Sequence, residues 1–145
     1  MDRKSEWDIL TRKALDLYQD GEHERALEVA ADALAYAEET YGADHPSVAT
    51  SLGNIALFHV DQGRYGEAEP LYRRALEIKE KALGPNHLSV ALSLSNLAEC
   101  YFGQGRYDLA EPLYQRSLVI RNKTLGPGHP VVAWSLNDLA DLCRA

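Results

Sequence analysis

The chain has 145 residues, of which 46% are hydrophobic and 26% charged, values that are ordinary for one soluble globular domain. Its net charge of −7 disfavours nucleic acids and anionic membrane surfaces as partners. No segment approaches the roughly 18 consecutive apolar residues that a membrane span needs, and the N-terminus has no apolar signal core. We therefore expect a cytoplasmic protein.

The first forty residues hold most of the negative charge, with eleven acids and five bases (11 − 5 = 6, net −6). A solvated acidic N-terminal cap is one interpretation, and a docking patch for a basic partner is the other. The two cysteines, Cys100 and Cys143, belong to no CxxC pair. Both lie in helical patterns, where a free cysteine behaves as a small hydrophobic residue.

The sequence repeats itself every 42 residues. Residues 41–82 align without a gap on residues 83–124, with 22 of the 42 positions identical. The period extends backward to the N-terminus and forward to the C-terminus, so the chain holds about three and a half units. We expect one domain over 1–145, with units at 5–40, 47–82 and 89–124 and a half-unit helix at 130–144.

The first unit, 5–40, is the most divergent. It lacks the AEPLY block of the later units, and Lys13 stands where they have Ile55 and Leu97. Both departures suit an N-terminal cap, whose outer side has no neighbour to cover it.

The second unit, 47–82, has the pattern of two helices. In the first helix, an apolar stripe with i, i+3, i+4, i+7 spacing is expected to face the core: Leu52, Ile55, Ala56 and His59. Gly63 suits a left-handed turn after this helix, and Tyr65 starts the next one. Pro46 fits the first position of a helix, where a missing N–H costs nothing.

The third unit, 89–124, repeats this pattern, and a histidine precedes each of the last three first helices: His45, His87 and His129. Equivalent atoms in successive units would lie roughly 15–20 Å apart if helix-packing distances add, so one metal ion cannot collect them. We expect them to cap or pack the linkers. No phosphate-loop, GxSxG or HExxH motif is present, and we predict neither an enzyme nor a cofactor.

The half-unit, 130–144, would lack a second helix over its leucine stripe. A weak homodimer through this C-terminal helix is therefore an alternative hypothesis.

Small residues recur at positions where helices must touch, including Ala56, Ala98, Ala68 and Ala110. Short side chains let helix axes approach closely, so adjacent hairpins can share one core. The repeat therefore predicts an all-α solenoid of stacked helical hairpins.

The motifs Gly63-x-Tyr65-x-x-Ala68 and Gly105-x-Tyr107-x-x-Ala110 resemble the tetratricopeptide repeat. The 42-residue variant is similar to the repeats of kinesin light chains and their bacterial relatives. The resemblance implies a right-handed superhelix whose first helices line a concave face, and a non-catalytic scaffold that binds proteins or extended peptides. Such arrays are also appended to larger signalling proteins, so a regulatory arm excised from one is a further alternative.

Asn54 and Asn96 are the principal candidates for peptide contact. A carboxamide can both donate and accept, so it can pair with the backbone of an extended peptide; a purely structural role is the alternative. The other expected members of the concave face are Arg12, Tyr18, Leu57, Asp61, Leu92, Glu99, Phe102, Asn137 and Asp138. Similar repeats clamp a terminal carboxylate with several basic residues, but here only Arg12 and Arg144 could do so, and we predict no such clamp.

Overall fold

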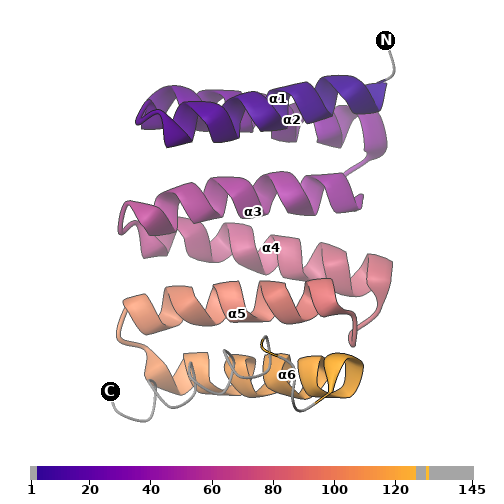
Figure 1. Ribbon diagram of the computed structural model, residues 1–145, viewed down its shortest axis with the longest axis vertical. Helices are drawn as coiled ribbons and strands as arrows, with labels where there is room; N and C mark the ends of the chain where they lie inside the picture. The colour runs from indigo at the N-terminus through magenta and orange to yellow at the C-terminus, as the bar shows by residue number, and fades with distance from the viewer. Residues whose placement is uncertain (1–2, 127–129, 131–145) are drawn as a thin grey trace. The chain divides into compact units, whose positions relative to one another are not determined.

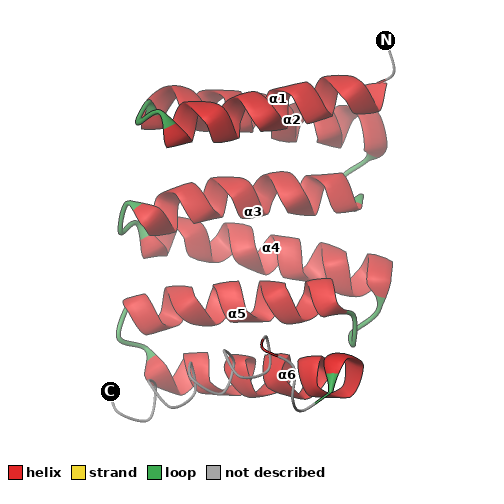
Figure 2. Ribbon diagram, in the orientation of Figure 1, coloured by secondary structure: helices red, strands yellow, loops and turns green. Residues whose placement is uncertain are grey.

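The computed structural model describes residues 3–126 and residue 130, and these are helical apart from short connections (Figures 1 and 2). The helices are α1 Arg3–Gln19, α2 His23–Tyr41, α3 Pro46–Asp61, α4 Tyr65–Leu83, α5 Leu88–Gly103 and α6 Tyr107–Leu125. No strand occurs in this part of the chain, and the predicted all-α class is confirmed. The chain forms two compact units, Met1–Ile78 and Lys79–Ala145.

The apolar stripe predicted for α3 is the buried face of that helix. Leu52 and Ala56 are almost fully buried, Ile55 is buried, and His59 is half-buried. Phe58 is also buried, so the face that α3 turns inward is wider than the predicted stripe. The alanines at the predicted helix contacts, among them Ala68 and Ala110, have no exposed surface.

A glycine with a positive φ follows each of the helices from α1 to α6 and allows a sharp change of direction. Gly63, with a φ of 77°, follows α3 as its sequence context predicts. Only glycine adopts this backbone region without a steric cost. The full set recurs at intervals of 21 residues, half of the repeat: Gly21, Gly42, Gly63, Gly84, Gly105 and Gly126.

The linker histidines cap the first helices. The Nδ1 atom of His45 accepts a hydrogen bond from the backbone N–H of Ser47 at 3.1 Å, and that of His87 accepts one from Ser89 at 3.0 Å. Each satisfies one of the unpaired N–H groups at a helix start. Their predicted role in holding the linkers is thus an N-cap, while His129 lies outside the described residues.

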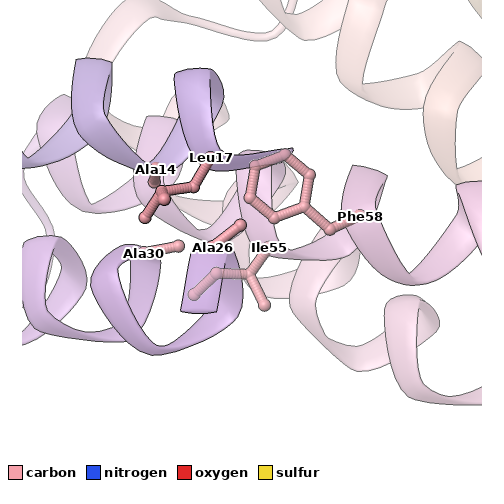
Figure 3. Close-up of a cluster of buried hydrophobic side chains, with 6 residues drawn as sticks. All are labelled: Ala14, Leu17, Ala26, Ala30, Ile55 and Phe58. Atoms are coloured by element: carbon pink, nitrogen blue, oxygen red, sulfur yellow. The ribbon is translucent and has the colours of Figure 1, made fainter. Parts of the chain in front are cut away.

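The compact unit Met1–Ile78 buries small residues of α1 and α2 against larger ones of α3. Figure 3 shows one cluster of this core, in which Phe58 and Ile55 of α3 lie beside Ala14, Leu17, Ala26 and Ala30. A second cluster joins α2, α3 and α4 around Val48, Leu52 and Ile78. Trp7 packs against that cluster, and its indole N–H donates to the buried Ser51 hydroxyl at 2.9 Å.

In the compact unit Lys79–Ala145, two consecutive hydrogen bonds join α5 and α6. Ser117 is fully buried and donates to the carbonyl oxygen of Ala91 at 2.9 Å. Its Oγ lies 2.8 Å from that of Ser95. Since the single hydroxyl hydrogen of Ser117 goes to Ala91, Ser95 must be the donor in this pair.

The second helices of successive repeats carry an ion pair that recurs with the 42-residue period. Arg74 of α4 lies 3.3 Å from the Glu38 carboxylate of α2, and Arg116 of α6 lies 3.3 Å from the Glu80 carboxylate of α4. All four side chains are about one-third or more exposed, so each pair is worth at most about 1 kcal/mol.

Candidate functional site

The outward face of α3 combines an amide, an apolar side chain and a carboxylate. Asn54, Leu57 and Asp61 follow one another at i, i+3 and i+7, which places them on one side of the helix. Asn54 is half-buried, whereas Leu57 is 51% exposed and Asp61 is exposed. Apolar surface of Leu57 thus lies open to solvent beside a half-buried amide.

The outward face of α5, in the compact unit Lys79–Ala145, also carries an amide, an apolar side chain and a carboxylate. Leu92, Asn96 and Glu99 follow one another at i, i+4 and i+7. Leu92 is 49% exposed, Asn96 is half-buried and Glu99 is exposed. Each unit therefore presents one half-buried asparagine flanked by a leucine that is about half exposed.

Neither asparagine carboxamide is hydrogen-bonded to any other residue that the structure describes. Each amide offers two donors and one acceptor, and a partly desolvated polar group without a protein partner is destabilising unless water or a ligand satisfies it. Both side chains can thus accept a ligand's hydrogen bonds without first breaking one to a described residue.

Ser95 differs from its neighbour Asn96 in this respect. The Ser95 hydroxyl donates its hydrogen to Ser117 of α6 and so cannot donate it to a ligand.

Tyr18 and Asp61, both predicted for the concave face, are brought together by the structure. The Tyr18 hydroxyl donates to Asp61 Oδ2 at 2.6 Å, and its ring stacks on Phe58 at a centroid distance of 4.2 Å. His23 lies on the same ring at 4.5 Å. Burial and the hydrogen bond to Asp61 raise the pKa of Tyr18 to about 12. Tyr18 therefore joins α1 to α3.

The remaining predicted residues lie in different settings. Arg12 is exposed on α1, where it occupies the repeat position of Asn54 and Asn96. Phe102 is half-buried and meets the ring of Tyr107 edge-on at 5.1 Å. Asn137 and Asp138 lie outside the described residues, as does the C-terminal helix of the dimer hypothesis.

The described residues contain no group of three or more histidine, cysteine or acidic side chains placed to hold a metal ion. None of the helices that the structure describes is both long and apolar enough to cross a membrane.

The family model for the tetratricopeptide repeat matches the sequence three times, over residues 8–81, 47–118 and 89–145. These matches overlap and together cover nearly the whole chain. This chain belongs to the tetratricopeptide repeat family. Its repeats are of a fold that is typical of protein-interaction scaffolds, and no curated protein sequence matches it significantly.

Solved tetratricopeptide structures superpose closely on the chain. The kinesin-light-chain-like, nearly identical TPR-like repeats of Podosopora anserina share 27% identity at a TM-score of 0.86, over 98% of this chain and 67% of that one. BtubC (BKLC) from P. vanneervenii shares 24% identity at a TM-score of 0.89, over 99% of this chain and 57% of its own length. The N-terminal domain of STI-1 from C. elegans shares 16% identity at a TM-score of 0.71, covering 97% and 98%. The last two likenesses concern the fold alone.

Three features of this tetratricopeptide chain are not evident from a single repeat. The Tyr18–Asp61 hydrogen bond joins residues of two different 42-residue repeats. The Glu38–Arg74 ion pair also joins two repeats, through residues 36 positions apart. The Ser95–Ser117 pair replaces Gly53 and Ala75 of the preceding unit. A comparison of the two units position by position would have found the serine pair, because both members change together.

Proposed function

We propose that the protein is a non-catalytic scaffold that binds extended peptide segments of another protein, and that the outward face of α3 in one compact unit and the outward face of α5 in the other each form a contact surface. The observation that carries the proposal is the pair of half-buried asparagines, Asn54 and Asn96, neither of which is hydrogen-bonded to another described residue. Membership of a family typical of protein-interaction scaffolds supports the same function.

The two carboxamides would pair with backbone N–H and C=O groups of the peptide, which are present whatever its sequence. Leu57 and Leu92, each about half exposed, would cover apolar side chains of the peptide. Backbone pairing would supply affinity that depends little on sequence, and the leucines would supply a preference for apolar residues.

A displayed library of random peptides, selected on the immobilised protein, provides ligands for a direct test. We expect Asn54→Ala or Asn96→Ala to weaken binding of a selected peptide by roughly 5–30-fold, and the double variant to weaken it further, since each substitution removes one or two hydrogen bonds of about 1 kcal/mol. Asn122→Ala is the matched control, because Asn122 is exposed on the second helix α6.

The far-ultraviolet circular dichroism and the Tm of all four variants, the control included, should match the wild type. A double variant that binds selected peptides as tightly as the wild type, or a control variant that loses as much affinity, would refute the proposed site.

Self-association through the C-terminal helix remains a prediction, because that helix lies outside the described residues.

A further inference from the structure

The two N-cap histidines stand at corresponding positions of the two compact units, His45 before α3 and His87 before α5. In each, the ring nitrogen Nδ1 accepts a hydrogen bond from the backbone N–H two residues later, at 3.1 Å and 3.0 Å. A nitrogen accepts such a bond only while it carries no proton, and imidazole takes up its proton within roughly pH 5–8. A proton on Nδ1 would remove the cap and place a positive charge at a helix N-terminus, where the helix dipole disfavours it.

The start of α3 has support besides its cap. The His45 ring stacks on Tyr41 at a centroid distance of 4.6 Å, and the face of an aromatic ring attracts a cation. The backbone N–H of His45 donates to the carbonyl oxygen of Gly42 at 3.3 Å. Pro46, at the first helical position, has no N–H, so α3 begins with one donor fewer to satisfy. Asp44, which makes an interaction of its own, directly precedes His45 in the sequence.

The start of α5 lacks these supports. Leu83 stands at the repeat position of the stacked tyrosine, and the neutral Asn86 stands at that of the aspartate. Leu88 replaces the proline, so α5 begins with one backbone N–H more. Among the described residues, the N–H of His87 makes no counterpart of the bond from the His45 N–H. His87 therefore caps a helix start that has more donors to satisfy and fewer other contacts.

Two charged groups at the linker between α4 and α5 already pair with each other. Arg116 of α6 donates to the carbonyl oxygen of Pro85 at 3.3 Å and lies 3.3 Å from the carboxylate of Glu80. In the part of the chain that the structure describes, no carboxylate lies within ion-pair distance of either N-cap histidine. Because the Arg116–Glu80 pair is neutral overall, it supplies no counter-ion to a protonated His87.

We infer that the start of α5 is an acid-sensitive element of the fold, and that the start of α3 is much less so. Protonation of His87 would leave the N–H of Ser89 without its acceptor, and the first turn of α5 would open more readily. The inference is independent of the proposed function, although it concerns the helix that carries the proposed contact residues Leu92 and Asn96.

Urea unfolding measures this sensitivity as the unfolding equilibrium constant at about pH 5 divided by that at about pH 8, a range that spans the titration of imidazole. The wild type is compared with His87→Asn, whose side-chain oxygen caps a helix without titrating, and with the matched control His45→Asn. Loss of a cap changes the constant by roughly 3–10-fold, so the ratio should be larger by that factor in the wild type than in His87→Asn. His45→Asn should keep nearly the wild-type ratio. Effects of acid on other groups are common to all three proteins and cancel.

Nuclear magnetic resonance provides a second readout, in the protein without substitutions. As the ring of His87 takes up its proton, the amide proton signal of Ser89 should move upfield, because its hydrogen bond to Nδ1 is lost. The inference fails if His87→Asn keeps the wild-type ratio, or if His45→Asn lowers the ratio as much as His87→Asn does. It also fails if the Ser89 signal stays in place while His87 titrates.

Discussion

The hydroxyl groups of Ser95 and Ser117 lie 2.8 Å apart, at the two positions where the preceding repeat has Gly53 and Ala75. The pair joins the two helices of a hairpin, and Ser117 passes the chain of hydrogen bonds on to the carbonyl oxygen of Ala91. One repeat thus closes this contact with small apolar residues and the next closes it with a polar pair. Both arrangements leave no unpaired hydroxyl group at this helix contact, because the two positions change together.

A double-mutant cycle tests this coupling. Ser117→Ala should lower the free energy of unfolding by about 1–2 kcal/mol, because it leaves the Ser95 hydroxyl without its acceptor and removes the additional hydrogen bond to the Ala91 carbonyl oxygen. Adding Ser95→Ala to that variant should cost nothing more. Urea unfolding gives the free energy of unfolding of the wild type, of each single variant and of the double variant. Strictly additive losses would show that the two serines act independently.

The bond between Tyr18 and Asp61 predicts an unusual titration. In a spectrophotometric titration of phenolate absorbance, one tyrosine should ionise near pH 12, and this step should vanish in Tyr18→Phe. Asp61→Asn should lower the pKa of Tyr18 only part of the way, since burial is the largest cause of the shift. A wild-type titration in which no tyrosine ionises near pH 12 would contradict the burial of Tyr18 and its hydrogen bond to Asp61.

The same shift makes stability depend on alkaline pH. The folded-state pKa of Tyr18 lies above the ordinary value of 10.0, so its contribution to stability is fully present below about pH 10 and is lost as the pH rises toward 12. Tyr18→Phe should flatten this part of the stability profile, measured by urea unfolding at a series of pH values.

The histidine N-caps can be tested at His87, which isolates the cap because His45 also stacks on Tyr41. His87→Ala should destabilise the protein by about 0.5–1 kcal/mol, since the N–H of Ser89 loses its acceptor. His87→Asn restores a side-chain oxygen at the N-cap and should recover the loss. Equal destabilisation by both substitutions would argue that the imidazole ring itself is required.

Two glycines with open surroundings predict effects of opposite sign. Gly63→Ala should destabilise the protein by roughly 1 kcal/mol or more, because φ is 77° there and alanine adopts this backbone conformation only at a cost. A clash does not contribute, since an added Cβ would meet no other atom within 4 Å. Gly53→Ala should stabilise it by up to about 1 kcal/mol, because Gly53 lies inside α3 with equally free surroundings. The changes in Tm should differ in sign.

The periodicity of the sequence was sufficient to predict the helical hairpins. Leu52, Ile55 and Ala56 keep the spacing of one helix face, and Gly63 and Pro46 mark a helix end and a helix start. These are local signals, each set by a few neighbouring residues, and the structure confirms them. The stripe missed Phe58, because a helix enclosed by neighbours on several sides buries more than one face.

The details of the outward face could not be predicted in the same way. Tyr18 has no equivalent partner in the later units, where Val60 and Phe102 hold its position, so the repeat gives no hint of its bond to Asp61. Ser95 and Asn96 are adjacent in sequence, yet only the serine finds a partner across the hairpin. Such contacts depend on side-chain length and on distance in space.

The most direct test of peptide binding by α3 and α5 is a nuclear magnetic resonance titration of ¹⁵N-labelled protein with a selected peptide. The side-chain amide signals of Asn54 and Asn96 should shift in proportion to the bound fraction, whereas the Asn122 signal should stay in place. If the shifts fall instead on the second helices α4 and α6, with both asparagine signals unmoved, the peptide binds elsewhere and the proposed site is wrong.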